Sequence, residues 1–319
     1  MKKSLPTLTI AVCAYNEAKN AAPFLTSLLR QDLQGLILKE ILFVSDGSTD
    51  NTVAIVKKIQ RNNRIVRLIQ HKTRIGKSSH LNTIYRNLKT DYLVQTDADV
   101  IFEDKQAIQQ IVTPMLKDKA LYMTCGNPIP APASTYLEIA HNVVYMSLCE
   151  THKPIRGGQS AFIADGRLLG YRASFIKHVK VPHDMIANDV FTYFACRARG
   201  LKARYIPEAN VIFRGPQLFR DKLRQNARSS AVKLRMIRHF PTQLVEKEMH
   251  IPLSVNLKSK YNQFKRSPIM GIYMYCINIY CQIRAVWYEK NLSAVWPIAK
   301  TTKRILTIGA LLTLGEAAI

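Results

Sequence analysis

Three aspartates of this 319-residue chain stand at the ends of short apolar runs. Asp46 ends the run Glu40–Asp46, and Asp97 and Asp99 directly follow the run Tyr92–Thr96. Residues i and i+2 of an extended backbone face the same side, so Asp97 and Asp99 can point at one centre. Two converging carboxylates repel each other unless a proton or a cation separates them, and Mg²⁺ or Mn²⁺ suits one or two carboxylates together with substrate phosphates. The pair therefore predicts a divalent metal site, with a solvated turn that caps the next helix as the alternative.

A regular alternation of apolar and amphipathic segments in the first 125 residues can position these aspartates. We expect strands at Leu8–Cys13, Glu40–Asp46, Ile65–Gln70, Tyr92–Thr96 and Leu121–Cys125, and helices at Ala18–Arg30, Asp50–Arg61, Lys77–Leu88 and Asp104–Lys117. This alternation predicts an α/β fold with a Rossmann-like, open, mostly parallel sheet and helices on both faces. Ligands of such sheets bind where the carboxyl ends of the strands and their loops meet.

The second half of the chain is less regular. Pro128, Pro130 and Pro132 predict a break after the fifth strand. Beyond them we expect a helix at Ser134–Cys149, short strands at Ala161–Asp165 and Leu168–Arg172, a helix at Val190–Arg199, strands at Lys202–Ile206 and Asn210–Phe213, and a basic helix over residues 219–238. The six cysteines are far apart, which predicts reduced and mostly buried thiols. Met1–Lys3 leads into a strand-like run, so no secretory leader is expected.

Several common enzyme motifs do not occur. Gly76-Lys77-Ser78 is similar to the end of a P-loop, but His71 stands where that motif needs its first glycine. No G-x-G-x-x-G follows the first strand, and the chain has neither G-x-S-x-G nor H-E-x-x-H. The sequence therefore disfavours ATPases, dehydrogenases, serine hydrolases and zinc proteases.

Four motifs occur in a fixed order at the ends of the expected strands: Ala14-Tyr15-Asn16-Glu17, the segment Ser45–Thr52, the segment Gly76–Asn82, and Asp97-Ala98-Asp99. In this arrangement the chain resembles the nucleotide-sugar domain of the family-2 inverting glycosyltransferases, which have the GT-A fold. The resemblance is strong over residues 7–102. It continues more loosely to residue 238 through the segments Gly166–Arg172, Asn188-Asp189 and Gln225–Arg228.

The resemblance implies a role for each matched residue. The base and ribose of a nucleoside diphosphate-sugar would be contacted by Asp46 and by Ala14, Tyr15, Asn16 and Glu17. Asp97 and Asp99 would hold Mg²⁺ or Mn²⁺ against the diphosphate, and Gln225 and Arg228 would lie near the diphosphate or the acceptor. Asp189 would be the general base, the alternative being an N-cap of the helix near Val190. By charge alone, Lys72, Arg74 and Lys77 are further phosphate contacts, with a solvated basic loop as the alternative.

The resemblance also implies three segments: residues 1–126 bind the nucleotide-sugar, residues 127–238 bind the acceptor and carry the base, and residues 239–319 form a basic and apolar extension. Two departures from the family matter. Asn188 stands where the family usually has Glu, although Asp189 is kept. Ser229 follows Arg228 where the processive synthases have Trp, which favours transfer of one sugar or a few to a discrete acceptor.

The chain is strongly basic: 46 Lys and Arg against 22 Asp and Glu give a net charge of +24, most of it beyond Arg197. Such a surplus indicates an anionic partner, which can be a nucleic acid, a lipid surface or a phosphorylated substrate. No helix-turn-helix, zinc finger or RNA-recognition motif is found, so no specific nucleic acid is expected. The apolar runs Ile269–Ile283 and Ile305–Leu314 can be core helices, interfacial helices or a membrane span. We expect a protein at the cytoplasmic face of the membrane, peripheral or held by a C-terminal inserted helix.

These observations lead to one main hypothesis: a metal-dependent inverting transferase that moves a sugar from a UDP- or GDP-sugar to a glycan or lipid-linked acceptor, in the synthesis of a cell-surface polysaccharide or glycolipid. Two alternatives stay open. A nucleotidyltransferase on a related α/β sheet can use the same carboxylates, and a basic nucleic-acid-binding protein would explain the charge.

Overall fold

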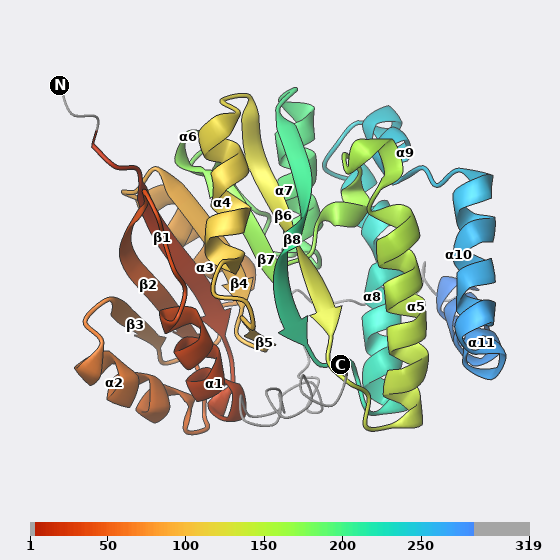
Figure 1. Ribbon diagram of the computed structural model, residues 1–319, viewed down its shortest axis with the longest axis horizontal. Helices are drawn as coiled ribbons and strands as arrows, with labels where there is room; N and C mark the ends of the chain where they lie inside the picture. The colour runs from red at the N-terminus through yellow and green to blue at the C-terminus, as the bar shows by residue number, and fades with distance from the viewer. Residues whose placement is uncertain (1–3, 284–319) are drawn as a thin grey trace.

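The computed structural model describes residues 4–283, which build one curled sheet of eight strands with helices on both faces (Figure 1). In chain order the strands are β1 Thr7–Ala14, β2 Ile37–Asp46, β3 Val66–His71, β4 Tyr92–Asp97, β5 Val100–Ile101, β6 Leu121–Pro130, β7 Leu168–Arg172 and β8 Lys202–Phe213. The order across the sheet is β3-β2-β1-β4-β7-β6-β8-β5. The predicted α/β fold with a mostly parallel sheet is confirmed.

Eleven α-helices lie within residues 4–283. They are α1 Ala18–Leu29, α2 Thr52–Asn62, α3 Lys77–Asn87, α4 Ala107–Lys117, α5 Tyr136–His152, α6 Ala173–Ile176, α7 Asn188–Ala198, α8 Phe219–Ile237, α9 Thr242–Met249, α10 Leu253–Arg266 and α11 Pro268–Ile283. In Figure 1, α5, α8, α10 and α11 stand together at one end of the molecule, and β1–β3 with α1 and α2 form the other end. Each helix expected in the first 125 residues is present, with bounds that differ by at most three residues from those expected.

The pattern of apolar residues explains the parallel half of the sheet. β1 pairs in parallel with β2 and β4, and β2 pairs in parallel with β3. Leu8, Ile10 and Val12 of β1 belong to a core shared with α1, α2 and α4, and Ala11 belongs to the opposite core under α3 and α7. Because both faces of β1 are covered, its sequence is apolar almost without interruption. Because β1, β2, β3 and β4 run parallel, the loops that follow them lie at one edge of the sheet, at the carboxyl ends of these strands.

Three expectations for the second half were wrong in detail. Ala161–Asp165 is no strand, and residues Ala161–Ile163 form a 3₁₀ turn, because β7 already occupies the gap between β4 and β6. Pro128 and Pro130 do not end β6. Beyond Cys125 this strand pairs only with β8, so its other edge needs no N–H donors.

The two short strands expected at the end of the sheet are one continuous strand, β8. The sequence favoured a division because Pro207 and Glu208 interrupt the apolar pattern. A register irregularity between β6 and β8 accommodates these residues: Tyr205 pairs with Cys125, and the next pair is Asn210 with Asn127. The bulged stretch therefore lies inside the strand and does not terminate it.

The C-terminal helices α10 and α11 pack against α5 and α8. α11 confirms a helix over the run 269–283, whose inner side buries Gly271, Met274, Ile277 and Cys281. Among residues 4–283, no helix has both the length and the apolar character needed to cross a bilayer. The second apolar run, 305–314, lies outside the described residues. All six cysteines are free; Cys125, Cys196 and Cys281 are buried, and Cys276 is exposed.

Candidate active site

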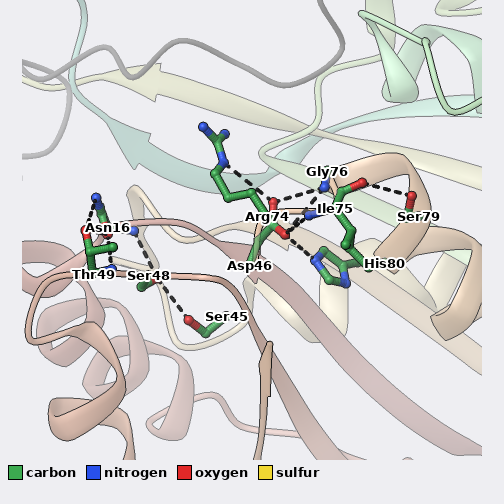
Figure 2. Close-up of polar contacts among 10 residues, drawn as sticks. All are labelled: Asn16, Ser45, Asp46, Ser48, Thr49, Arg74, Ile75, Gly76, Ser79 and His80. Atoms are coloured by element: carbon green, nitrogen blue, oxygen red, sulfur yellow. Dashed lines mark hydrogen bonds and ion pairs between the residues drawn. The ribbon is translucent and has the colours of Figure 1, made fainter. Parts of the chain in front are cut away.

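The carboxylate of Asp46 lies in a cradle of hydrogen-bond donors at the carboxyl end of β2 (Figure 2). Its Oδ1 accepts from Ile75 N–H at 2.8 Å and lies 2.8 Å from His80 Nε2, and Gly76 N–H donates to Oδ2 at 3.2 Å. Burial pushes the pKa of Asp46 upward, but the hydrogen bonds from His80 and from the backbone outweigh it, so the pKa lies below its ordinary value. Asp46 is therefore held as a charged acceptor.

The predicted nucleotide segment Ala14–Glu17 is tied to the loop that follows β2 (Figure 2). Asn16 has a φ of +54°, a conformation that Asn tolerates better than most residues. In this position its Oδ1 accepts from Thr49 N–H at 2.8 Å, and its own N–H donates to a serine of the same loop. The Arg74 guanidinium stacks over the ring of Tyr15, 3.9 Å from the ring centroid. Two strand-end loops and the start of α3 thus meet in one place.

A second group of charges gathers at the end of β4. Lys77 Nζ donates to Asp97 Oδ1 at 2.5 Å, and both side chains keep 21% and 30% of their surface exposed, respectively. Burial would lower the pKa of Lys77, but the charge of Asp97 outweighs it and the pKa is raised. Asp99 lies two residues on, in the turn between β4 and β5. It does not cap the next helix: α4 begins at Ala107, and Asp104 is the carboxylate that bonds to the backbone there.

Asp189 stands in the first turn of α7 and faces this group. Its Oδ2 accepts from Gly166 N–H at 3.0 Å. A Cβ placed on Gly166 would lie 3.5 Å from Asp97 Oδ2, 3.7 Å from Asp189 Oδ2 and 3.7 Å from Lys77 Nζ. Three predicted site residues from three separate elements therefore surround one small space. The alternative role of Asp189 as an N-cap is wrong, because α7 has Ala187 at its N-cap without a side-chain bond.

Desolvation controls the charge of Asp189. Burial raises its pKa, and the neighbouring charge of Asp165 raises it further, while Lys77 acts in the opposite direction. The net shift is upward. A carboxyl with a raised pKa holds a proton more strongly than an ordinary aspartate does, which is the property required of a general base.

The basic helix α8 brings Arg228 near Asp189 and Asp97, whose charges act on it. Arg228 Nη2 donates to the carbonyl of Ile186 at 2.9 Å, just before α7. Burial lowers the pKa of Arg228 to about 10, and the charges of Asp189 and Asp97 oppose this shift. Gln225 lies one turn earlier on α8, and its buried Oε1 has no hydrogen-bond partner among the described residues. Of the predicted basic contacts, Lys77 and Arg228 lie near Asp97 and Asp189, whereas Arg74 lies beside Asp46 and Lys72 is exposed.

A model of glycosyl transferase family 2 matches residues 9–179, which is more than half of the chain. The chain belongs to this family. The matched region contains Asp46, Lys77, Asp97 and Asp99, and it ends before Asp189. The resemblance noted from the motifs is thereby confirmed.

Relatives of this glycosyltransferase include polysaccharide synthases. The poly-beta-1,6-N-acetyl-D-glucosamine synthase of Staphylococcus aureus is 28% identical over 210 residues, which are 64% of this chain and 49% of the synthase. The synthase of the same name from Staphylococcus epidermidis is 25% identical over 207 residues, 63% of this chain and 48% of its own length. The chain thus spans about half the length of the curated relatives it matches.

Solved structures show the same fold. A mannosyltransferase, PcManGT of Pyrobaculum calidifontis, in complex with GDP-Man and Mn²⁺, is 20% identical with a TM-score of 0.59, and the match covers 98% of this chain and 80% of that one. Residues 1–349 of TarS from S. aureus are 12% identical with a TM-score of 0.52, covering 90% and 92%. The curled sheet is accordingly the GT-A sheet of the glycosyltransferases.

Several residues of the candidate site were not identified from the sequence. His80 supports Asp46, and Arg167 forms an ion pair with Asp165 at 2.9 Å and lies over the Phe213 ring. Asp165 and Arg167 flank Gly166 in a segment whose motif was noticed only loosely. Their importance comes from the position of β7, which runs antiparallel between β4 and β6 and so carries the preceding loop to the end of β4. No local sequence pattern predicts that β7 lies between β4 and β6.

Asp97 and Asp99 fit a hard divalent cation only when other groups supply further oxygen ligands. Within residues 4–283, no group of three or more His, Cys, Asp and Glu side chains can hold a metal ion by itself. Two partly exposed carboxylates suit Mg²⁺ or Mn²⁺ when phosphate oxygens and water complete the coordination shell. In the free protein, the Lys77 ammonium balances the charge of Asp97.

A cavity of about 600 Å³ lies between α5 and α8. Asp165 and Tyr145 line it, and Tyr145 Oη donates to Asp165 Oδ2 at 3.2 Å. Further along, its walls come from Leu148, Phe162 and residues at the start of the C-terminal extension. Ser229 and Ser230 form part of the α8 wall, so the residue that replaces the family's Trp faces this cavity.

Proposed function

We propose that this protein is an inverting glycosyltransferase that moves one sugar from a nucleoside diphosphate-sugar to a hydroxyl group of a glycan or lipid-linked acceptor. The observation that carries the proposal is the convergence of Asp97, Lys77 and Asp189 around Gly166. One side of this space offers cationic and metal-binding groups for a diphosphate. The other side offers a desolvated carboxylate for a hydroxyl proton.

On the donor side, Asp46 and the segment Ala14–Glu17 hold the base and the ribose. Lys77 and Arg228 donate to the diphosphate oxygens, and Asp97 and Asp99 are the residues that would hold Mg²⁺ or Mn²⁺. When bound, this cation supplies positive charge beside the leaving oxygens. Negative charge grows on the diphosphate as the glycosidic bond breaks, so positioned cationic donors lower the barrier. The binding of GDP-Man and Mn²⁺ by the mannosyltransferase with the same fold supports this division of roles.

On the acceptor side, Asp189 takes the proton of the attacking hydroxyl. The hydroxyl oxygen forms a bond to the anomeric carbon of the sugar, and the bond from this carbon to the diphosphate oxygen breaks with its electron pair. Attack from the face opposite the leaving group inverts the anomeric centre. No covalent sugar–enzyme intermediate is required, so a single carboxylate base is sufficient.

The cavity between α5 and α8 is the proposed entry of the acceptor. It begins at Asp165, whose charge is coupled to that of Asp189, and it leads toward the C-terminal helices. The poly-beta-1,6-N-acetyl-D-glucosamine synthases among the relatives support a glycan as the acceptor. Ser229 leaves the cavity wall open where the processive synthases place Trp, and we therefore favour a discrete acceptor over polymer extrusion.

A membrane surface is the proposed place of action. Leu253, Leu257 and Tyr261 of α10 are 73%, 58% and 66% exposed, and α11 exposes Ile269 and Ile283 still more fully. Lys258, Lys260, Lys265 and Arg266 accompany this apolar face. Each Lys or Arg near an anionic lipid surface contributes about 1 kcal/mol to the free energy of membrane binding.

Flotation with phosphatidylglycerol vesicles tests this role of α10. The wild type should float with the vesicles, and Leu253→Glu/Leu257→Glu should not. Leu5→Glu, at the opposite end of the molecule, serves as the control. Equal recovery of all three proteins would refute this role of α10.

The experiment for the transferase itself is a panel of UDP-, GDP-, dTDP- and CDP-sugars incubated with Mn²⁺, followed by analysis of the nucleotide product. A free nucleoside diphosphate indicates glycosyl transfer or slow donor hydrolysis. In a parallel assay with nucleoside triphosphates and sugar 1-phosphates, release of pyrophosphate would instead indicate a nucleotidyltransferase. The absence of both products, together with salt-resistant retention of nucleic acid, would favour the binding protein. Asp189→Asn should stop turnover, and Asp32→Asn in the exposed loop after α1 is the matched control.

A further inference from the structure

The two oxygens of Asp46 are used very unequally. Oδ1 lies 2.8 Å from Ile75 N–H, 2.8 Å from His80 Nε2 and 3.4 Å from Gly76 N–H. Oδ2 receives Gly76 N–H at 3.2 Å, and the Arg74 Nε is 3.8 Å away, beyond hydrogen-bond distance. A carboxylate oxygen accepts about two hydrogen bonds. Oδ1 is therefore saturated by the protein, and Oδ2 keeps room for one more donor.

His80 is built into this arrangement. Its side chain is 2% exposed, and its ring packs against that of His71 with 4.5 Å between the ring centroids. It comes from the first turn of α3, directly after the loop that supplies the two backbone donors. Figure 2 shows His80 and the Ile75–Gly76 backbone approaching Asp46 from the same side. Because the ring is buried and packed, it cannot move aside without a cost when a ligand arrives.

We infer that His80 is a positioning residue that leaves Asp46 a single acceptor oxygen, and that this selects uracil over guanine as the base of the donor nucleotide. The inference rests on the proposed function and adds the nucleotide class to it. Uracil presents one ring N–H, flanked on both sides by carbonyl oxygens. Guanine presents a ring N–H beside an amino group, and this pair of donors requires both oxygens of a carboxylate.

The surroundings of Oδ2 favour the same base. Arg74 stands next to Oδ2, so the position beside the single acceptor is occupied by a donor. A uracil carbonyl can accept there while the ring N–H donates to Asp46. A guanine amino group would face Arg74, donor against donor. A buried polar group left without a partner costs about 1–3 kcal/mol, which corresponds to about a 5- to 150-fold loss of affinity.

Calorimetric titration of the full chain with UDP, GDP and CDP in the presence of Mn²⁺ tests the inference. The wild type should bind UDP at least about tenfold more tightly than GDP. His80→Ala frees Oδ1, so the ratio of the two affinities should fall to about threefold or less. His80→Gln keeps an N–H donor in reach of Oδ1 and should retain most of the preference. Ser79→Ala changes the neighbouring residue, whose hydroxyl donates to the Ile75 carbonyl, and should leave the ratio unchanged.

Asp46→Asn should reverse the preference between UDP and CDP, which a purely structural role of His80 would not produce. The two 2.8 Å contacts at Oδ1, from Ile75 N–H and His80 Nε2, would fix the amide oxygen there and turn the amide nitrogen toward the base. A donor at this position rejects the uracil ring N–H and suits the ring nitrogen acceptor of cytosine. The variant should therefore bind CDP more tightly than UDP, by about fivefold or more.

The possible outcomes distinguish a failure of the proposed function from a failure of the base assignment. If the wild type binds no nucleoside diphosphate at all, the proposed function fails. If it binds GDP as tightly as UDP, the base assignment fails while the transferase stands. If His80→Ala keeps the full preference, or if Asp46→Asn weakens UDP and CDP equally, His80 does not set the base. Should His80→Ala not fold, the wild-type ratio and the Asp46→Asn reversal still decide.

Discussion

Removal of the Lys77 ammonium should change metal binding and turnover in opposite directions. In the free protein this ammonium lies 2.5 Å from Asp97 Oδ1, where a cation at the proposed metal position would compete with it. Hydrogen bonds to charged groups contribute about 1.5–3 kcal/mol. Loss of this competitor in Lys77→Met should therefore tighten Mn²⁺ binding to the nucleotide-free protein by about 10- to 100-fold.

Turnover should suffer from the same substitution. With donor and metal in place, Lys77 is free to turn to the diphosphate, and removal of one positioned donor from a developing oxyanion costs about 10²–10³ in rate. Free Mn²⁺ measured by electron paramagnetic resonance gives the affinity, and release of nucleoside diphosphate gives the rate. Lys72→Met in the same loop is the control, because Lys72 is exposed. Unchanged or weaker Mn²⁺ binding in Lys77→Met would refute the competition between the two cations.

Three further predictions concern single side chains. Asp189→Asn should lower kcat by at least about 10³ while nucleotide affinity stays the same. Because the pKa of Asp189 is higher in the folded than in the unfolded protein, its ionisation lowers the free energy of unfolding as the pH rises from the unfolded to the folded pKa. The Asn variant carries no such charge and should therefore melt at a higher temperature than the wild type at neutral pH. A lower melting temperature would contradict the raised pKa. Gly166→Ala should fold normally, since its Cβ meets Asp97 and Lys77 at ordinary contact distance, yet lose about tenfold or more in turnover because the methyl group fills the reaction space. Glu248→Ala should destabilise the fold by about 3–5 kcal/mol in chemical denaturation, because this carboxylate is 1% exposed and receives Arg156 Nη2 at 2.8 Å; a loss below about 1 kcal/mol would exclude a structural role.

The proximity of the candidate donor-side residues could be predicted from the sequence because it depends on local geometry. Each strand of the parallel half ends in a loop that carries its own motif, and parallel pairing brings these loops to one edge. The register places Cys13 beside Asp97 on one side and Val44 on the other, so the loops after β1, β2 and β4 are neighbours by construction. The i, i+2 spacing of Asp97 and Asp99 needed no tertiary information.

The acceptor half could not be read in the same way, because its contacts join residues far apart in the chain. Gly166 N–H reaches Asp189 across 23 residues, and Ser78 Oγ donates to Asn188 Oδ1 across 110. Both contacts depend on the reversed strand β7 and on the place of α7 under the sheet. The role of His80 was missed for another reason: a buried histidine in an amphipathic helix gives no sign of the carboxylate that it will meet.

The charges of the cleft distinguish one carboxylate from the others. Asp46 has His80, Asp97 has Lys77 and Asp165 has Arg167 as cationic or donor partners within 3 Å. Within residues 4–283, no ion pair is formed with Asp189. Burial pushes the pKa of both Asp165 and Asp189 upward, but Arg167 reverses the shift for Asp165 alone. Neighbouring carboxyls whose pKa values are driven apart take different roles in a reaction. Arg167 thus stabilises the charged form of Asp165, whereas Asp189, without such a partner among residues 4–283, is the carboxyl that we propose as the base for the acceptor hydroxyl.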